Sequence, residues 1–323
     1  MPALDPDVEN LLELARKAGR PPFEALTPEQ ARAAYAASWD VLQPPAAEVG
    51  SVRDVTIAGK AGDLRLRVYR GIGTQAGEPL PCLVFLHGGG WVIGNLESHD
   101  RICRCLANRA RICVVAVDYR LAPEHRYPAA VDDCVTALEW VAGNAGTLGV
   151  APGRIGIGGD SAGGNLAAVL ALMGRDGSAP PAMFQALLYP VVDLTAASAS
   201  YRRVTSGVPL TAATMHYFID HYTPAASDRL DWRASPLLAK SLAGTPPALV
   251  LTVAHDPLCD EGVAYARRLE DDGVRVTALH LSDHMHGMLM HGKLVQAGNV
   301  ILDFVGAAIG DALHRGVPTG RTR

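Results

Sequence analysis

The chain has 323 residues, of which 49% are hydrophobic and 19% charged, and its formal net charge is −4. A chain of this length can bury one large α/β core or two smaller ones. The sequence contains no basic block interleaved with aromatic residues, which argues against a nucleic-acid partner. No apolar run is long enough to span a bilayer, and the acidic stretch at residues 1–9 lacks the apolar core of a signal peptide.

The cysteines bear on the compartment. Six of them lie mostly in apolar surroundings without C-x-x-C spacing: Cys82, Cys103, Cys105, Cys113, Cys134 and Cys259. We interpret them as small buried side chains in a reducing compartment rather than as a disulfide framework. The expected location is therefore cytoplasmic.

Residues 1–48 are predicted to be helical. A second helix in this segment is expected to begin with Thr27 as its cap and Pro28 at its first position, with Gln30 completing a capping box, and to run through Val41. The segment carries no catalytic signature. Its apolar side is expected to cover either the main sheet or a binding site.

The pattern then changes to strands. Period-two alternation at 52–57 and 64–70 predicts an antiparallel hairpin with one solvated face. Continuously apolar strands are expected further along the chain, at 82–86, 112–117, 154–158, 184–188, 248–253 and 274–280. Because amphipathic helical patterns separate most of them, the fold class is α/β, with a mostly parallel sheet covered on both faces. Ligands of such sheets bind beyond the carboxyl ends of the strands.

Residues 159–163 (Gly-Asp-Ser-Ala-Gly) fit the G-x-S-x-G pattern of a nucleophile elbow, in which a strand turns sharply into a helix and exposes the serine hydroxyl. An apolar strand precedes this segment and a good helix former follows it. The helix begins directly after Ser161, so its free N–H groups favour an oxyanion there. Ser161 is therefore the candidate nucleophile, although an ordinary glycine-rich turn would give the same pattern.

Residues 87–91 (His-Gly-Gly-Gly-Trp) directly follow another predicted strand. Consecutive glycines leave backbone N–H groups open to a ligand. Together with the N–H of Ala162, the N–H groups of Gly89 and Gly90 are candidates for an oxyanion hole, and Gly88 is a further candidate donor. The histidine at the start of this loop is interpreted as a structural orienter of the loop rather than as a base.

Three motifs together resemble the hormone-sensitive-lipase-like family of esterases, which are microbial carboxylesterases of the α/β-hydrolase fold. They are the glycine loop at 87–90, residues 119–124 (Tyr-Arg-Leu-Ala-Pro-Glu) and residues 159–164 (Gly-Asp-Ser-Ala-Gly-Gly). The resemblance covers nearly the whole chain. It implies a mostly parallel central sheet of about eight strands, flanked by helices and covered by a helical cap.

The long section between two of the strands reads as an insertion, because a short connection would suffice there. The domains expected from the resemblance are cap helices at 1–48, a catalytic domain at 49–190 and 235–315, and a cap insertion at 191–234, with a flexible tail at 316–323. The candidates for contact with the substrate are Trp91, Trp39, Met215, Phe218, Leu258 and Met288. The cap residues among them would equally well belong to the core of the cap.

The candidate acid and base come last in the chain. Asp256 follows an apolar strand and matches the catalytic acid of the family, and Asp260 is expected to cap the next helix. His286, followed by glycine, occupies the position of the family's base. Three histidines at 280–286 also raise the question of a metal, but no carboxylate or cysteine has a clean ligand spacing, so neither a metal nor a cofactor is expected. Met288 stands where the family usually has phenylalanine.

The chain order of Ser161, Asp256 and His286 is that of α/β-hydrolases. The resemblance implies a serine carboxylesterase that hydrolyses short- to medium-chain esters through an acyl-enzyme. An amidase, lactonase or deacetylase would use the same triad. A small-molecule receptor on this scaffold is a further alternative, but plant gibberellin receptors, which resemble this family, have lost the catalytic histidine. The expected partner is a small ester, and a homodimer through the last helix and its neighbouring strand is also suggested.

Overall fold

The computed structural model describes residues 2–75 and 78–315, and the tail expected at 316–323 lies outside these residues. Their strands form one sheet of eight strands. From one edge to the other they are β1 (Ser51–Gly59), β2 (Gly62–Arg70), β4 (Cys113–Val117), β3 (Leu80–Leu86), β5 (Val150–Asp160), β6 (Gln185–Leu188), β7 (Ala248–His255) and β8 (Val276–Met285). β2 runs antiparallel to its neighbours β1 and β4, and every other pair is parallel. The predicted α/β class with a mostly parallel sheet is confirmed.

Burial along the strands explains their sequence patterns. Every residue of β3 and β4 is buried, because helices cover both faces of the sheet there. The predicted hairpin of β1 and β2 lies at one edge and keeps an exposed face. The register pairs Leu86 with both Val117 and Gly159. The carboxyl ends of β3, β4 and β5 therefore lie at one level, and the loops that follow them share one edge of the sheet.

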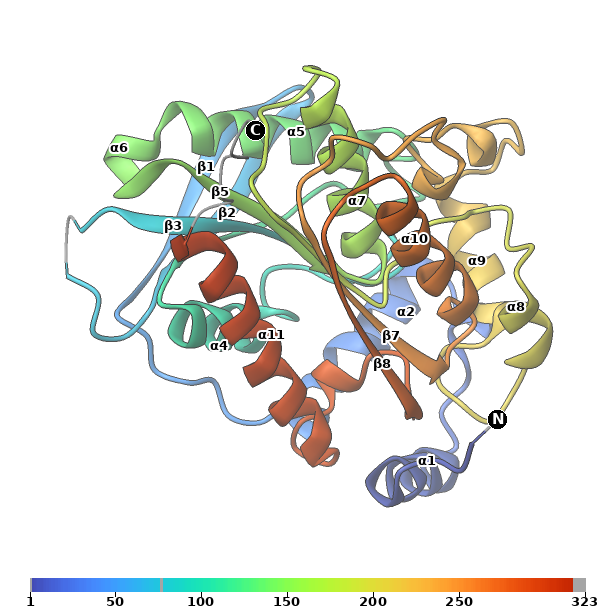
Figure 1. The fold of residues 1–323 in the computed structure, drawn as a ribbon. Helices are drawn as coiled ribbons and strands as arrows, with labels where there is room; N and C mark the ends of the chain where they lie inside the picture. Colours follow the sequence, from blue (N-terminus) through green and yellow to red (C-terminus); the bar gives the residue numbers. More distant parts are fainter. Residues whose placement is uncertain (1, 76–77, 316–323) are drawn as a thin grey trace.

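Helices cover the two faces of the sheet (Figure 1). One face carries α5 (Ala129–Gly143), α6 (Ala145–Leu148), α7 (Ala162–Arg175) and α10 (Cys259–Asp271), and the other carries α4 (Asp100–Ala110) and α11 (Gln296–Arg315). A short 3-10 helix, η4 (Met288–Met290), precedes α11. The buried apolar side chains form one large core on each face. None of the described helices is both long and apolar enough to cross a lipid bilayer.

The N-terminal segment contains α1 (Pro6–Ala18), η1 (Phe23–Ala25), α2 (Pro28–Ala36) and α3 (Trp39–Leu42). The predicted capping box is present, since Thr27 Oγ1 accepts the Gln30 N–H at 3.2 Å and Gln30 Oε1 accepts the Thr27 N–H at 3.0 Å. The predicted continuous helix through Val41 is wrong. The hydroxyl and the N–H of Ser38 both donate to the carbonyl oxygen of Tyr35, at 2.6 and 3.0 Å, so a local turn replaces the helical bond at this point.

The segment between β6 and β7 contains α8 (Ala199–Arg203), α9 (Ala212–Tyr222), η2 (Asp228–Leu230) and η3 (Pro236–Leu238). It contacts the N-terminal segment directly. Thr214 Oγ1 donates to Glu24 Oε2 at 2.7 Å, and the rings of Phe23 and Phe218 lie 6.0 Å apart. Two segments that are far apart in the sequence thus lie together beside the sheet (Figure 1).

Candidate active site

Ser161 stands at the turn from β5 into α7, and its backbone is strained. Its φ of +55° lies in a region that side chains other than glycine rarely adopt, and such strain is typical of functional positions. The glycines around it are required by space, since a Cβ at Gly163 would collide with the carbonyl oxygen of Leu86. The helix therefore packs directly against the end of β3. This close packing aims the Ser161 side chain at the edge where the loops gather.

Ser161, His286 and Asp256 form one chain of hydrogen bonds. Ser161 Oγ lies 2.9 Å from His286 Nε2, and His286 Nδ1 lies 2.6 Å from Asp256 Oδ2. Because the carboxylate can only accept, Nδ1 carries the imidazole proton and Nε2 is left free to accept the serine proton. Ser161 remains 7% exposed and Asp256 only 1%. The sheet brings the three predicted residues together from the ends of β5, β7 and β8.

Asp256 has a second task. Its Oδ1 accepts the Leu258 N–H at 2.9 Å at the start of α10. Asp260, which was expected to be the cap of this helix, lies inside its first turn and pairs with Arg203 at 2.9 Å. The capping prediction is therefore wrong for Asp260. One carboxylate both orients His286 and satisfies a free N–H group of the helix.

The glycine loop after β3 places two N–H groups near the elbow. Gly89 and Gly90 have φ values of +121° and +57°, which favour glycine. No described residue accepts a hydrogen bond from either N–H. Ala162 is the first residue of α7, so its N–H has no acceptor within the helix. Gly88 differs, because its N–H donates to Asp160 Oδ1 at 2.9 Å. Gly88 is therefore no longer a candidate donor.

His87 holds this loop. Its Nδ1 donates to the carbonyl oxygen of Gly88 at 2.8 Å, and its ring stacks on that of Tyr119 at 4.1 Å. The Tyr119 hydroxyl donates to the carbonyl oxygen of His87 at 2.6 Å. Burial lowers the pKa of His87 to about 4, so its ring is neutral at pH 7. These contacts support the predicted role as an orienter of the loop.

The motif at 119–124 is a scaffold that reaches the N-terminal segment. Glu124 pairs with Arg32 of α2 at 2.6 Å, and this guanidinium lowers the pKa of Glu124 to about 2. Arg32 also donates to the carbonyl oxygens of Val92 and Ala122, at 2.8 and 2.9 Å. It therefore joins α2 to the loops after β3 and β4. Arg32 was not among the predicted site residues, because a lone arginine on a helix carries no sequence signal.

Several of the residues suggested for substrate contact are buried in packing. Trp91 is fully buried and stacks on Tyr222 at 4.4 Å. Met288 is fully buried in the core beside α4 and α11. Met215 and Leu258 are also almost inaccessible. None of these four side chains offers more than a trace of free surface in this structure.

Phe218 is also buried, at 3% exposed, but it adjoins the glycine loop, and Trp39 keeps free surface. Phe218 packs directly on the Cα of Gly90, within the glycine loop. Trp39 is half-buried, with its ring 6.1 Å from that of Tyr35, and both line a cavity of about 490 Å³ beside the same loop. Tyr35 was missed because alternating alanines around it gave no aromatic pattern. The ring of Tyr35 is in turn 6.4 Å from that of Phe23, so aromatic rings extend from the loop across the N-terminal segment.

The three histidines at 280–286 have separate partners. β8 extends to Met285, further than expected, and delivers His286 directly at its end. His280 Nδ1 contacts Thr252 Oγ1 at 2.9 Å, and His284 Nδ1 contacts Asp283 at 2.7 Å. In the described part of the chain, no group of three or more His, Cys, Asp or Glu side chains is arranged to hold a metal ion.

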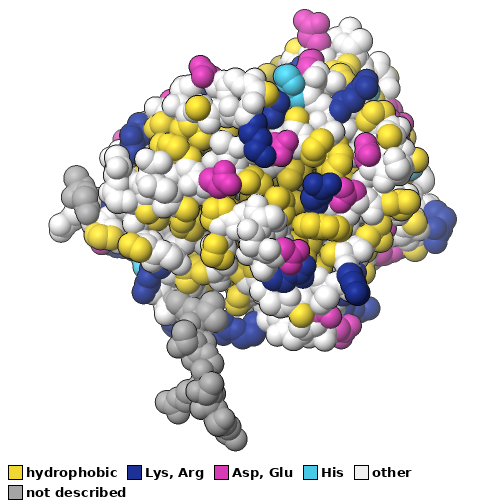
Figure 2. Space-filling view, turned by 90° about the horizontal axis from the view of Figure 1, so that it is seen from above, with side chains coloured by type: hydrophobic (Ala, Val, Ile, Leu, Met, Phe, Trp, Pro, Cys, Tyr) yellow, Lys and Arg dark blue, Asp and Glu magenta, His cyan; other side chains and the backbone are white. Residues whose placement is uncertain are grey.

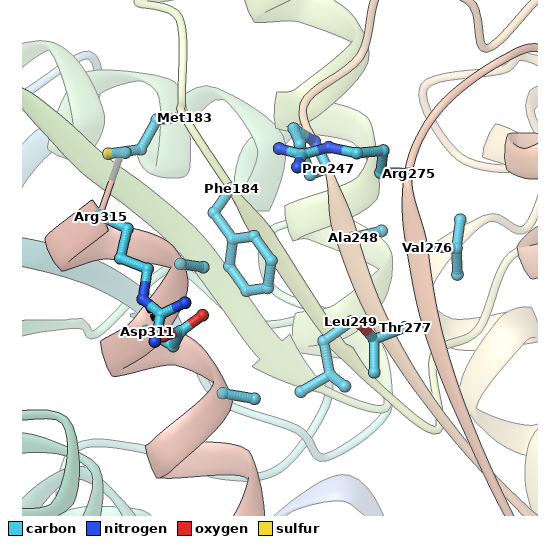
Figure 3. A pocket seen from close by; sticks show the side chains of 12 residues that line it. Met183, Phe184, Pro247, Ala248, Leu249, Arg275, Val276, Thr277, Asp311 and Arg315 are labelled. Carbon is cyan, nitrogen blue, oxygen red and sulfur yellow. Dashed lines mark ion pairs between the residues drawn. The ribbon is translucent and has the colours of Figure 1, made fainter. Parts of the chain in front are cut away.

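A cavity of about 650 Å³ lies at the other end of the strands, where β7 and β8 begin (Figure 3). It is lined by Met183, Phe184, Pro247, Ala248, Leu249, Arg275, Val276, Thr277, Ala308, Asp311, Ala312 and Arg315. Figure 2 looks onto the molecule from this side and shows hydrophobic side chains interspersed with charged ones. This cavity is separate from the residues around Ser161, because it lies at the amino ends of the strands and Ser161 lies at their carboxyl ends.

Comparisons with known proteins agree with this geometry. Residues 83–290 match the family model described as alpha/beta hydrolase fold. The chain is 40% identical over 296 residues to a carboxylic ester hydrolase of Mycobacterium tuberculosis, covering 88% of this chain and 77% of that protein. It is 38% identical over 301 residues to an ethyl acetate hydrolase of Pseudomonas putida, covering 91% of this chain and 94% of that protein.

Solved structures give the same result. An α/β hydrolase from the metagenome of Lake Arreo in Spain superimposes with a TM-score of 0.91 at 41% identity, covering 95% of this chain and 98% of that one. A thermostable esterase from Pseudomonas putida ECU1011 gives a TM-score of 0.92 at 35% identity, covering 97% and 98%. The chain therefore belongs to the α/β-hydrolase family, among the hormone-sensitive-lipase-like esterases, and is a carboxylic ester hydrolase.

Proposed function

We propose that Ser161, His286 and Asp256 are the catalytic triad of this esterase. The observation that carries the proposal is the continuous chain from Ser161 Oγ through His286 to Asp256, at 2.9 and 2.6 Å. His286 Nε2 takes the hydroxyl proton as Ser161 Oγ attacks the ester carbonyl carbon, and then gives it to the departing alcohol. Asp256 keeps the imidazole in the required tautomer and stabilises its cation.

The acyl group is then transferred to water by the same residues. His286 removes a proton from a water molecule as that water attacks the acyl-enzyme carbonyl, and returns the proton to Ser161 Oγ as the carboxylic acid leaves. We assign the oxyanion of both tetrahedral intermediates to the N–H groups of Gly89, Gly90 and Ala162. Each such donor is worth about 3 kcal/mol in the transition state.

We propose that the residues at 1–48 and 191–234 form the cap over the catalytic domain, which comprises 49–190 and 235–315. The contacts between Glu24 and Thr214 and between Phe23 and Phe218 support this division, because they join the two cap segments to each other. Phe218 also touches Gly90 and would form one wall of the acyl site. The substrates proposed are short- to medium-chain esters. The ethyl acetate hydrolase of Pseudomonas putida supports short acyl groups.

The test is the hydrolysis of p-nitrophenyl esters from acetyl to palmitoyl by the wild type and by Ser161→Ala. We expect turnover that peaks at short chains and is lost in the variant, while Ser206→Ala, at an exposed serine, leaves it unchanged. Most of the activity remaining in a folded Ser161→Ala would contradict the triad. A peak at palmitoyl would contradict the acyl range alone. Parallel assays with amides and lactones establish whether the same triad prefers those substrates.

We also propose a homodimer in which the β8 edges of two copies meet. β8 pairs only with β7 in the described sheet, and so leaves its other edge free to add a strand. On neighbouring α11, Val300 and Phe304 are 65% and 45% exposed and lie one turn apart on the same side. Light scattering checks the mass. Phe304→Lys should yield monomers, whereas Ile72→Lys, at an exposed apolar residue elsewhere, should not; a wild-type monomer would contradict the proposal.

The proposed location is the cytoplasm. All six cysteines are free thiols, as expected for a protein of a reducing compartment. Fractionation of the source cells with an antibody against the chain tests this location.

A further inference from the structure

A buried pair of ionisable side chains lies directly behind the glycine loop. Asp160 precedes Ser161, and His99 precedes α4. They are only 4% and 1% exposed, and His99 Nε2 lies 3.1 Å from Asp160 Oδ1. The proposed mechanism uses neither of them. Burying two ionisable groups costs free energy unless each has hydrogen-bond partners. The partners of His99 and Asp160 therefore indicate which of their atoms carry protons.

The surroundings of Ser98 fix the proton on one nitrogen of His99. Ser98 Oγ accepts the N–H of Asn95 at 2.9 Å and lies 2.8 Å from the carbonyl oxygen of Asn95. A carbonyl oxygen only accepts, so the single hydroxyl proton of Ser98 is donated there. Ser98 Oγ also lies 2.7 Å from His99 Nδ1. Since the hydroxyl has no second proton, Nδ1 carries one and donates it to Ser98.

Asp160 decides the state of the other nitrogen. Asp160 Oδ1 is an acceptor, since it takes the Gly88 N–H at 2.9 Å, and such a bond favours the carboxylate form. The Gly88 N–H lies 2.9 Å from Asp160 Oδ1 and 3.3 Å from His99 Nε2, and the shorter contact receives its proton. If Nε2 of His99 were unprotonated, its lone pair would face the carboxylate oxygen of Asp160 at 3.1 Å, and the two would repel each other. Nε2 therefore also carries a proton.

The groups that face His99 are consistent with a single cation. The ring of His87 lies 5.6 Å away and is kept neutral by burial. The ring of Phe85 lies 6.2 Å away on the side of β3. We propose that His99 is an imidazolium and a positioning residue of the esterase, which acts through Asp160 to hold the oxyanion loop against the nucleophile. This inference rests on the oxyanion hole proposed above.

The connection runs through two neighbouring residues. Asp160 is bonded covalently to Ser161 and accepts the Gly88 N–H, so it sets the distance between the serine and the N–H groups of Gly89 and Gly90. The fit is tight, because a Cβ at Gly88 would collide with Asp160 Oδ2. Without the charge of His99, this buried carboxylate would lose its counter-ion and would take up a proton or move. Either change releases the Gly88 N–H and loosens the loop.

The test compares His99→Gln with the wild type. Glutamine can still donate a hydrogen bond to Asp160 but carries no charge. We expect kcat for p-nitrophenyl acetate to fall by roughly 10- to 100-fold with little change in KM, because a displaced oxyanion donor acts mainly in the transition state. The affinity for a trifluoromethyl ketone, which forms a tetrahedral adduct, should fall in parallel. His125→Gln, at an exposed histidine, is the matched control and should change neither quantity.

A second measurement does not depend on folding of the variant. Nitrogen NMR of ¹⁵N-histidine-labelled wild type should show that both ring nitrogens of His99 are protonated at pH 7. One unprotonated nitrogen, or a folded His99→Gln with wild-type kcat, overturns the inference. The outcomes separate it from the proposed triad. If Ser161→Ala is inactive while His99→Gln is fully active, only the role of His99 is wrong; if Ser161→Ala is active, the triad is wrong and NMR still decides the charge.

The coupling between the two side chains provides a check on the route. Asp160→Asn alone should lower kcat at least as much as His99→Gln. Because both variants break the same connection, the double variant should be little worse than Asp160→Asn alone. Additive losses would show that His99 acts by some route other than Asp160, and would contradict the proposal.

Discussion

The ring of Phe218 lies against the Cα of Gly90 so closely that a methyl group could not be placed between them. One residue comes from α9 and the other from the loop after β3, so the segment between β6 and β7 touches the proposed oxyanion hole itself. The position of the loop and the shape of the acyl site are therefore set at the same contact.

Gly90→Ala should abolish most of the activity. The new Cβ would collide with Phe218, and the φ of +57° is unfavourable for alanine. We expect kcat to fall by about 100-fold or more, as for the loss of an oxyanion donor. Gly207→Ala is the control, because its φ is +80° but nothing lies near its Cβ. Equal kcat values in the two variants would show that the contact with Phe218 is unimportant.

Phe218→Leu should move the acyl preference towards longer chains. Leucine keeps the site apolar but removes part of the wall beside Gly90, so more space becomes available to the substrate. We expect the ratio of kcat/KM for the octanoyl ester to that for the acetyl ester to rise by about 10-fold or more, since one methylene in a pocket is worth roughly 1 to 3 kcal/mol. Tyr217→Leu, at the neighbouring half-buried position, serves for comparison and should leave the ratio as it is.

The buried His87 makes the fold sensitive to mild acid. Its pKa is lowered from 6.5 to about 4 by burial, so the unfolded chain binds this proton more readily than the folded protein. The free energy of unfolding therefore falls as the pH drops from 6.5 towards 4, and at pH 5 the loss is on the order of 2 kcal/mol. Urea titrations give the free energy of unfolding at pH 7 and at pH 5. The difference between these two values should be about 2 kcal/mol smaller in His87→Gln than in the wild type. An undiminished difference would mean that His87 does not carry the effect, and His125→Gln is the control.

Arg32→Lys should loosen the attachment of α2. Lysine keeps the charge towards Glu124 but cannot make the fork of bonds that reaches the carbonyl oxygens of Val92 and Ala122. We expect a loss of about 1 to 2 kcal/mol in the free energy of unfolding, measured with urea at pH 7. Arg20→Lys, at an exposed position after α1, should cost nothing. Equal stabilities would show that the ion pair with Glu124 alone holds the helix.

The sequence was most informative where chemistry coincides with the end of a strand. Ser161 and Asp256 follow buried apolar strands, whereas β8 before His286 is largely exposed along the sheet edge, contrary to the continuously apolar strand expected at 274–280. The parallel order of these strands brings the three residues together. The pattern also indicated the glycine loop, but not which of its N–H groups bond within the protein and which stay open to a substrate. Gly88 donates to Asp160, and that bond follows from a register between β3 and β5 that no local pattern encodes.

Helix ends and the direction of the Met288 side chain were predicted less well, for physical reasons. The break after α2 depends on the two bonds from Ser38 to one carbonyl oxygen, while the residues themselves are good helix formers. The N-cap of α10 is Leu258, whose N–H is accepted by Asp256, and Asp260 is not the cap because α10 already begins at Cys259. Met288 is fully buried because η4 turns it into the core beside α11, a direction that spacing alone does not give.

The hydrogen bond from Thr214 to Glu24 joins the two segments of the proposed cap, 1–48 and 191–234, which are far apart in the chain. Any opening that lifts α9 must carry residue 24 along or break this bond. In the proposed cap, the entry of an ester would therefore require both segments to move together rather than one of them alone. A change in the length of either segment would therefore alter the access of substrate, while Ser161, Asp256 and His286 would keep their places at the strand ends.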